Sequence, residues 1–479
     1  MFVSSEEFNS FRANQRWCTS LGDPACAASD WGLAVSTSAL GYCTDSVYNC
    51  IESLEVIAPD GSRQQARHLR GFPEITPVPE YRQGPTFAPA GGSVPLWEFD
   101  TPSGPVRILS PGRTEKMFLP SAGRWVDRGG ALFKLSLQPV TIDSRPALTK
   151  PEQTERIDMG SGVTRVEWTG WNEPDARGCV ATDTGECALE APFPADYRYR
   201  LTLRLRDEAS LYLNGSIDEP IAFSTKLSGG HRFVLEAGPS PTLAMAGWIP
   251  KAQIPRSLIE ETFESIGGHR NWDMETNANS GQPLGRGGNE PLAWFKALLP
   301  YFGDRASFVA DYWYVENTPT QGQFTSQCVD QGKGEFIGIV ASNATAYTGD
   351  PPRYNAATST LSYEIAGPHY MPDGITLSKG RYAINMNADF VKCILGVDKV
   401  PSQARVELIY PDGEASAATL AIKQDRNWLR LVYENFTFSN PTVSVKFPKT
   451  LTCTKGKGKK AKIRQVTAFQ CPKGWKPKR

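Results

Sequence analysis

The cysteines constrain this chain more than any other feature, because they decide which segments can be held together. Ten occur in 479 residues, and eight of them form close couples along the chain. We expect five disulfides, four of them local: Cys18–Cys26, Cys43–Cys50, Cys179–Cys187, Cys328–Cys393 and Cys453–Cys471. The pairing of Cys18 with Cys50 and of Cys26 with Cys43 is also open. Disulfides persist in oxidising compartments, so the pattern predicts a secreted protein.

Metal binding is the other use that proteins make of clustered cysteines. None of the spacings is the Cys-x-x-Cys of zinc ribbons or redox motifs. The chain holds four histidines, and none lies beside a cysteine couple. We therefore expect no metal site and no cofactor.

The N-terminal residues and the apolar runs bear on localisation. Met1-Phe2-Val3 leads directly into Ser4-Ser5-Glu6-Glu7, with no basic region and no apolar core of a signal peptide. No apolar run approaches the ~18–20 residues that cross a bilayer. Together with the cysteines, this predicts a soluble secreted protein whose signal has been removed, without a membrane span.

Composition favours short strands. Gly (43) and Pro (37) are both plentiful, which is typical of many strands joined by turns. We predict a mainly β protein with two to three tandem β-sandwich (immunoglobulin-like) domains. The expected segments are 1–49 (Cys-containing N-terminal segment), 50–145 (β-sandwich), 146–250 (second β domain), 251–324 (helical insert), 325–449 (C-terminal β-sandwich) and 450–479 (basic disulfide-looped tail).

Several stretches carry the strand signal directly. Residues 198–206 alternate strictly between basic or polar and apolar side chains, as a half-buried strand does. Residues 210–215 look like the next strand, ending in an Asn214-Gly215 turn. A Cys-Ile pair, a strand and a Pro-Asp-Gly turn occur twice, ending at residues 61 and 413, which favours two related sandwich domains. Later strands are expected near Glu335–Ala341, Ser359–Ile365, Arg381–Asn387, Trp428–Tyr433 and Thr442–Phe447.

Two helices are expected in the insert. Ser257-x-x-Glu260 has the form of a capping box and precedes a segment that stops at Gly267-Gly268. Asn289-Glu290-Pro291 begins the second helix, which ends at Gly303. Apolar residues fall at helical spacing along it: Leu292, Phe295, Leu298, Leu299 and Phe302. We interpret the insert as packed on a sandwich edge; a lid over a site is the alternative.

The last thirty residues carry a charge that the rest of the chain lacks. The chain has 51 basic and 51 acidic residues, and residues 450–479 hold ten of the basic ones and no acid. The remainder is therefore near −10, and the asymmetry predicts an anionic partner. We expect a loop closed by Cys453–Cys471 that binds a polyanion through Lys455, Lys457, Lys459, Lys460, Lys462, Arg464, Lys473, Trp475, Lys476, Lys478 and Arg479.

One motif suggests an enzyme. Trp171-Asn172-Glu173-Pro174 is similar to the signature of retaining glycoside hydrolases with a (β/α)8 barrel, in which the Glu is the acid/base. That resemblance implies Glu173 as proton donor, with Glu316 as the best placed nucleophile. The surrounding sequence does not alternate strands with helices as such a barrel requires. We therefore expect a non-catalytic protein and keep the glycosidase as an alternative.

The tail resembles the ends of secreted or cell-surface proteins of actinobacteria. The points of similarity are Cys453-Thr454-Lys455-Gly456-Lys457 and Cys471-Pro472-Lys473-Gly474-Trp475-Lys476. Looser similarity to proteins that bear this tail lies at Tyr48–Leu54, Gly367–Tyr370 and Phe436–Phe438. The resemblance implies export and residence at the cell surface or cell wall, and it implies no catalytic residue.

These observations lead to one hypothesis. We expect a structural or adhesive surface protein that its basic tail holds to an anionic envelope polymer or polysaccharide. Other surface proteins are further expected partners, and specific nucleic acid is not. An array of carbohydrate-binding modules is the alternative, suggested by twelve Trp and sixteen Tyr.

Overall fold

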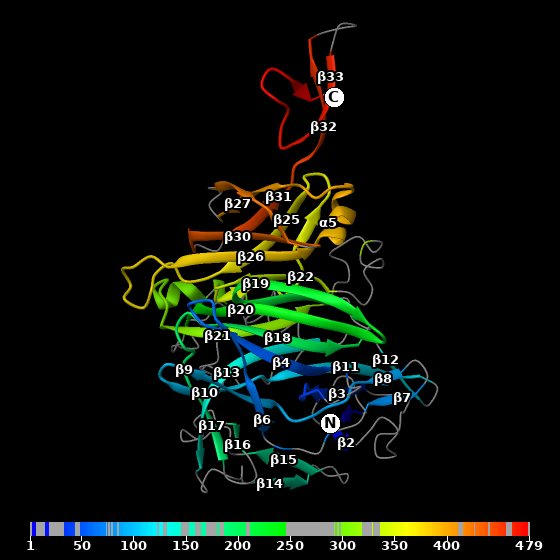
Figure 1. The fold of residues 1–479 in the computed structure, drawn as a ribbon, viewed down its shortest axis with the longest axis vertical. Helices are drawn as coiled ribbons and strands as arrows, with labels where there is room; N and C mark the ends of the chain where they lie inside the picture. Colours follow the sequence, from blue (N-terminus) through cyan, green and yellow to red (C-terminus); the bar gives the residue numbers. More distant parts are fainter. Residues whose placement is uncertain are drawn as a thin grey trace. The chain divides into compact units, whose positions relative to one another are not determined.

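The computed structural model (Figure 1) consists mainly of β-strands, which confirms the predicted fold class. The residues it describes are 2–5, 15–18, 33–43, 48–72, 74, 77, 80–83, 86–121, 124–127, 132–144, 153–158, 164–168, 180–181, 186–206, 211–245, 292, 295–296, 298–318, 328, 336–410, 415–425, 427–438, 441–456 and 462–477.

The chain divides into two compact units, each built from separate segments. Unit 1 comprises Met1–Ala209, Ile221–Ser240 and Asp311–Asn317; unit 2 comprises Ser210–Pro220, Pro241–Ala310 and Thr318–Arg479. The six segments expected from the sequence stay a prediction.

Unit 1 contains short antiparallel strands and parts of three longer ones. They are β1 (Phe2–Ser5), β2 (Gln15–Cys18), β3 (Leu33–Ala39), β4 (Cys50–Ile57), β5 (Arg63–Gln65), β6 (Arg67–Gly71), β7 (Tyr81–Gln83), β8 (Thr86–Ala88), β9 (Pro95–Thr101), β10 (Gly104–Leu109), β11 (Gly112–Ser121), β12 (Arg124–Asp127), β13 (Leu132–Ser144), β14 (Gln153–Asp158), β15 (Thr164–Trp168), β16 (Val180–Ala181), β17 (Glu186–Glu190) and β18 (Arg198–Leu205), with the unit 1 residues of β19 (Leu211–Leu227), β20 (Gly230–Ala244) and β21 (Phe308–Thr318).

Strand β18 shows how the sequence pattern becomes structure. Its residues alternate between half-buried and buried along the whole strand, as the alternating sequence predicts. Leu201 and Leu203 are fully buried, while Arg204 on the other face forms an ion pair with Glu52 of β4 at 3.3 Å. β18 lies between β4 and β20, so strands from segments expected to be separate domains share one sheet.

Strand β13 connects two groups of strands in unit 1. Its first half pairs with β11 and β21, and its second half pairs with β10 and β17. One long strand therefore takes part in both pairings, and its apolar residues Phe133, Leu135 and Leu137 are buried.

Unit 2 contains the remaining strands and the ordered helical turns. The strands are β22 (Phe336–Ser342), β23 (Ala346–Tyr347), β24 (Arg353–Asn355), β25 (Thr360–Ala366), β26 (Lys379–Asn387), β27 (Gln403–Ile409), β28 (Ala415–Ala421), β29 (Lys423–Asp425), β30 (Trp428–Thr437), β31 (Thr442–Lys446), β32 (Lys449–Lys455), β33 (Lys462–Ala468) and β34 (Lys476–Pro477). The five strands expected in this region are all present, with their ends shifted by a few residues.

Two sheets of unit 2 share one hydrophobic core. In one sheet β19 pairs in parallel with β22, followed by antiparallel β26, β30 and β29. In the other, β25, β31, β27 and β28 are neighbours in that order. Their apolar faces supply a single cluster of buried side chains, including Val340, Ile384, Leu431, Val406 and Val445.

The Asn-Gly turn expected at residues 214–215 is absent. β19 continues straight through it, because Asn214 and Gly215 pair with Val340 and Ala341 of β22. Asn214 is fully buried, and its Nδ2 donates to the carbonyl oxygen of Gly349 at 2.9 Å. The ladder with β22 therefore overrides the local turn preference of the dipeptide.

The second expected helix is confirmed at its C-terminal end. Described residues between 292 and 298 are helical and lead into the 3₁₀ turn η5 (Leu299–Phe302), which Gly303 ends in a left-handed conformation at φ 65°. Leu292, Phe295 and Leu299 are buried in one cluster. Residues 308–318, expected within the helical insert, form β21 instead. The first expected helix lies outside the described residues.

One helix was not predicted. α5 (Ala388–Leu395) follows β26 directly, with Asn387 as its N-cap and Gly396 as its C-cap at φ 62°. The side chain of Asn387 accepts hydrogen bonds from the backbone N–H groups of Asp389 and Phe390. Both capping residues can be read from the sequence, but only the strand that precedes them was predicted.

Three of the expected disulfides lie within the described residues and form as paired: Cys43–Cys50, Cys328–Cys393 and Cys453–Cys471. The first of these excludes the rival pairing at the N-terminus. Cys187 is also disulfide-bonded, whereas Cys18, Cys26 and Cys179 have side chains outside the described part of the chain.

Candidate functional site

The described part of the basic C-terminal segment forms a small β-sheet, and the expected closure by Cys453–Cys471 is present. β32 and β33 form an antiparallel hairpin whose register runs from Lys449 opposite Ala468 to Lys455 opposite Lys462. β34 pairs with the other edge of β32, placing Lys476 beside Thr454. Thr, Ile and Val are frequent in these strands and favour extended backbone, a signal that the high charge of the segment concealed.

A disulfide and a tight turn bring β34 back to the hairpin. Cys453 in the middle of β32 is fully buried and bonded to Cys471, with their Cα atoms 5.8 Å apart. The chain then reverses where the N–H of Trp475 donates to the carbonyl oxygen of Pro472 at 2.9 Å. Gly474, third in this turn, has φ 82°, which a side chain would strain. This geometry accounts for the cysteine at position 471 and the glycine at position 474.

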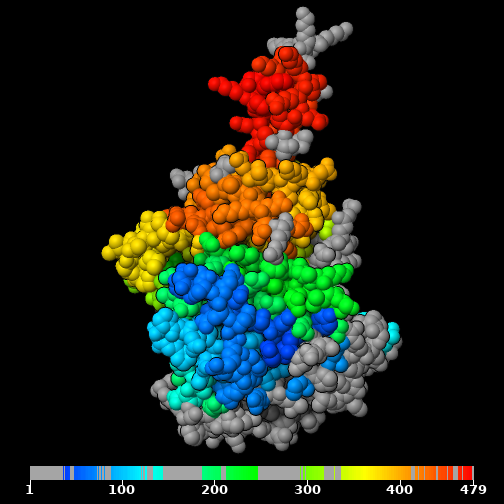
Figure 2. Space-filling view, viewed as in Figure 1, coloured from blue at the N-terminus to red at the C-terminus, as the bar shows by residue number. Residues whose placement is uncertain are grey.

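Charge is divided between the two faces of the hairpin. Because side chains alternate along a strand, Lys455, Cys453, Lys462 and Arg464 lie on one face. Thr452, Thr454, Ile463 and Gln465 lie on the other face. In the space-filling view, long side chains project from the hairpin, shown in red (Figure 2).

The exposed cations of the hairpin have no acidic neighbour in sequence. Residues 450–479 contain no Asp or Glu. Among the residues that the structure describes, no carboxylate forms an ion pair with the exposed cations of the hairpin: Lys455, Lys462, Arg464, Lys473 and Lys476. The arrangement can therefore attract an anion from outside the chain.

The predicted binding residues are only partly placed by the structure. Lys455, Lys462, Arg464, Lys473 and Lys476 are exposed, and Trp475 is half-buried. Trp475 thus offers only part of its ring for stacking. Lys457, Lys459, Lys460, Lys478 and Arg479 lie outside the described residues.

The glycosidase motif at residues 171–174 lies outside the described residues, so the separation of Glu173 from Glu316 is not defined. Glu316 itself is on β21 with 14% of its side chain exposed. Its Oε2 accepts from the hydroxyl of Tyr314 at 2.7 Å and lies 3.2 Å from Nζ of Lys134.

Aromatic side chains in the body mostly fill the cores. The described tryptophans Trp97, Trp125, Trp313 and Trp428 are all buried. Tyr42 in unit 1 is different, because 45% of it is exposed while its ring stacks on His68 at 4.0 Å between centroids.

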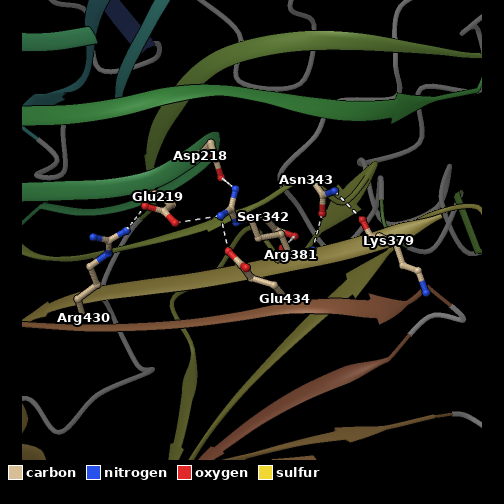
Figure 3. Close-up of polar contacts among 8 residues, drawn as sticks. All are labelled: Asp218, Glu219, Ser342, Asn343, Lys379, Arg381, Arg430 and Glu434. Atoms are coloured by element: carbon tan, nitrogen blue, oxygen red, sulfur yellow. Dashed lines mark hydrogen bonds and ion pairs between the residues drawn. The ribbon is translucent and has the colours of Figure 1, made fainter. Parts of the chain in front are cut away.

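A polar cluster that the sequence did not reveal lies in unit 2 (Figure 3). The guanidinium of Arg381 on β26 forms ion pairs with Asp218, Glu219 and Glu434, the second through Nη2 and Oε1 at 3.0 Å. Arg430 on β30 forms an ion pair with Glu219 at 2.7 Å. Three carboxylates and two guanidiniums nearly neutralise one another, so the cluster holds β19, β26 and β30 together and leaves little charge for a ligand.

The backbone around Arg381 is held by two neighbouring side chains. Oδ1 of Asn343 accepts from the N–H of Arg381 at 2.7 Å, and its Nδ2 donates to the carbonyl oxygen of Lys379 at 2.9 Å. The hydroxyl of Ser342 donates to the carbonyl oxygen of Arg381 at 2.9 Å. These contacts fix the position of the arginine before its side chain meets the carboxylates.

Two further searches concern the described residues alone. They contain no group of three or more His, Cys, Asp or Glu side chains placed to hold a metal ion. Their helices are too short or too polar to cross a membrane.

Comparison with known proteins gives no match: no family model, no curated protein and no solved structure is similar to this chain.

Proposed function

We propose that this chain is a secreted, non-catalytic surface protein that its C-terminal hairpin holds to an anionic polymer of the cell envelope. The observation that carries the proposal is the C-terminal segment: residues 450–479 hold ten cations and no acid, and their described part forms a sheet closed by a disulfide. Binding of such cations to a polyanion is favourable because it releases the counterions condensed on the polymer.

The disulfides support the extracellular part of the proposal. Bonded cysteines lie in unit 1 at Cys43–Cys50 and in unit 2 at Cys328–Cys393 and Cys453–Cys471. Such bonds are maintained in oxidising compartments. The similarity of the tail to surface proteins of actinobacteria agrees with this localisation. We propose that the β-sheet body is the part that the cell displays.

The test is a salt series of pulldowns with isolated cell envelope, comparing the full chain with a chain that ends at Lys449. This end point keeps Nζ of Lys449, which donates to the carbonyl oxygen of Ala357 at 3.1 Å. We expect only the full chain to bind, and to be released as salt rises, because screening weakens such contacts. Equal binding of both chains refutes the tether.

A second candidate is a carbohydrate-binding body, favoured by Tyr42. Its ring is exposed yet held in place by the stack on His68 and by Trp97, whose ring meets it edge-on at 5.6 Å. Aromatic rings fixed in this way present an apolar surface for stacking. Saturable glycan binding by the chain ending at Lys449, lost on Tyr42→Ala, would support this candidate.

A further inference from the structure

The hairpin places its cations unevenly, and the register shows where. Lys455 and Lys462 are directly opposite each other at the end of the ladder, and Arg464 is two residues further along β33. Alternation puts all three on one face, with neighbouring Cβ atoms about 5–7 Å apart. Lys476, beside Thr454, falls on the opposite face.

This juxtaposition is unfavourable in the free protein. Like charges directly opposite each other destabilise a strand pair. Elsewhere in unit 2 the chain provides partners for its cations, as with Lys392 and Asp389 at 2.8 Å and Arg405 and Glu407 at 2.9 Å. The hairpin departs from this rule on one face, and an external anion would relieve the repulsion there.

The opposite face lacks such a concentration of charge. Thr452, Thr454 and Gln465 are neutral, and Ile463 is 58% exposed. A polyanion that follows this face would meet Lys476 as its cationic neighbour among the described residues.

The cations fix the sign of the charge that the ligand carries. Residues 450–479 contain eight Lys and two Arg. Both side chains bind phosphate and carboxylate groups, Arg through its bidentate fork and Lys as a point charge. A linear polyanion therefore matches the face.

Resting on the proposed function, we propose that the face formed by Lys455, Lys462 and Arg464 is the contact surface of the tether, and that its ligand is a linear polyanion. The three cations lie close enough for one flexible chain to contact them together. Cys453 lies on the same face, so its bond to Cys471 holds the chain at residue 471 on this face, next to the cations.

The test compares two double variants of the full chain that remove the same number of lysines. Lys455→Gln with Lys462→Gln alters the proposed face, and Lys473→Gln with Lys476→Gln alters the turn and β34. Binding to poly(glycerol phosphate) is measured across a salt series. We expect the face variant to lose about tenfold or more in affinity at low salt and to reduce the log–log salt slope by about 2, with a smaller change in the control.

Each other outcome has a definite meaning. If both variants lose the same affinity while the full chain binds, net charge alone determines binding. The assignment of the face is then wrong, whereas the proposed tether is supported. Binding by the chain ending at Lys449 overturns the tether itself. Free-thiol titration confirms that Cys453–Cys471 is intact in every variant.

Discussion

At the scale of single residues, His68 shows how burial changes a titration. Its ring contacts Tyr42, stacked at 4.0 Å, and Trp97, edge-on at 5.3 Å. Burial lowers the pKa of His68, and a backbone hydrogen bond involving Arg70 opposes this effect. The neutral imidazole is therefore the form that the folded unit favours.

This burial predicts a pH dependence of stability. Because the folded pKa lies below the unfolded value of about 6.5, the contribution of His68 is complete above that pH and is lost as pH falls through and below it. We expect the unfolding midpoint of unit 1 to fall between pH 7.5 and 5.5. His68→Phe keeps a ring in the stack and should reduce this dependence, measured by urea unfolding at both pH values. An unchanged slope would contradict the assignment.

The residues of the candidate site were predictable as a set but not in their arrangement. The absence of acids in residues 450–479 identified the cations directly. Which of them share a face depends on the strand register, and register follows from pairing and turn geometry that composition does not show. Arg381 and its carboxylates come from three distant segments, so no local pattern marked them.

At the scale of elements, the Arg381 cluster joins strands that no hydrophobic pattern relates. Asp218 and Glu219 belong to β19, Arg381 to β26, and Glu434 with Arg430 to β30. Glu219 also has a positive φ of 44°, so its ion pairs hold the backbone in an unfavourable conformation.

Removing the central arginine tests this role. Arg381→Ala leaves Asp218 and Glu434 without their shared cation, and we expect unit 2 to lose about 1–3 kcal/mol of unfolding free energy. The control is Arg405→Ala, whose ion pair with Glu407 is more exposed and should be worth about 0–1 kcal/mol. Urea unfolding followed by tryptophan fluorescence measures both. Similar losses in the two variants would show that the cluster is not structural.

Elements whose sequence has a clear hydrophobic period were predicted correctly. Elements whose conformation depends on pairing with a neighbouring strand were not. The alternation of residues 198–206 became β18, and the apolar spacing after Asn289 became helix. Asn214-Gly215 failed as a turn because pairing with β22 decided its conformation. α5 was missed because only eight residues separate its two caps, too few for a clear helical period.

At the scale of the whole molecule, the hairpin is independent of the other strands. β32, β33 and β34 pair only with one another among the described strands. We therefore expect the chain ending at Lys449 to keep the thermal midpoint of the full chain within about 2 °C, since no other sheet loses a strand. Scanning calorimetry of both chains measures this. A lower midpoint would show that the hairpin stabilises the body.

The mainly β class was predicted from the Gly and Pro content and from the strand patterns. Which strands pair with one another could not be predicted in this way. β4 pairs with β18 across about 150 residues of chain, and β19 pairs in parallel with β22 across more than 120. The apolar faces of many strands are interchangeable. A hydrophobic pattern therefore predicts that a strand will pair, but not which strand its neighbour is.

The pairing of β13 with β21 sets an order of events during synthesis. Residues Lys134–Leu137 of β13 pair with Trp313–Glu316 of β21. This edge of β13 therefore stays unpaired until almost two thirds of the chain has been synthesised. Contacts between residues this far apart in the sequence form slowly, because closing the intervening loop costs conformational entropy. Until then unit 1 is incomplete, and its open strand edges are the point at which a chaperone would bind.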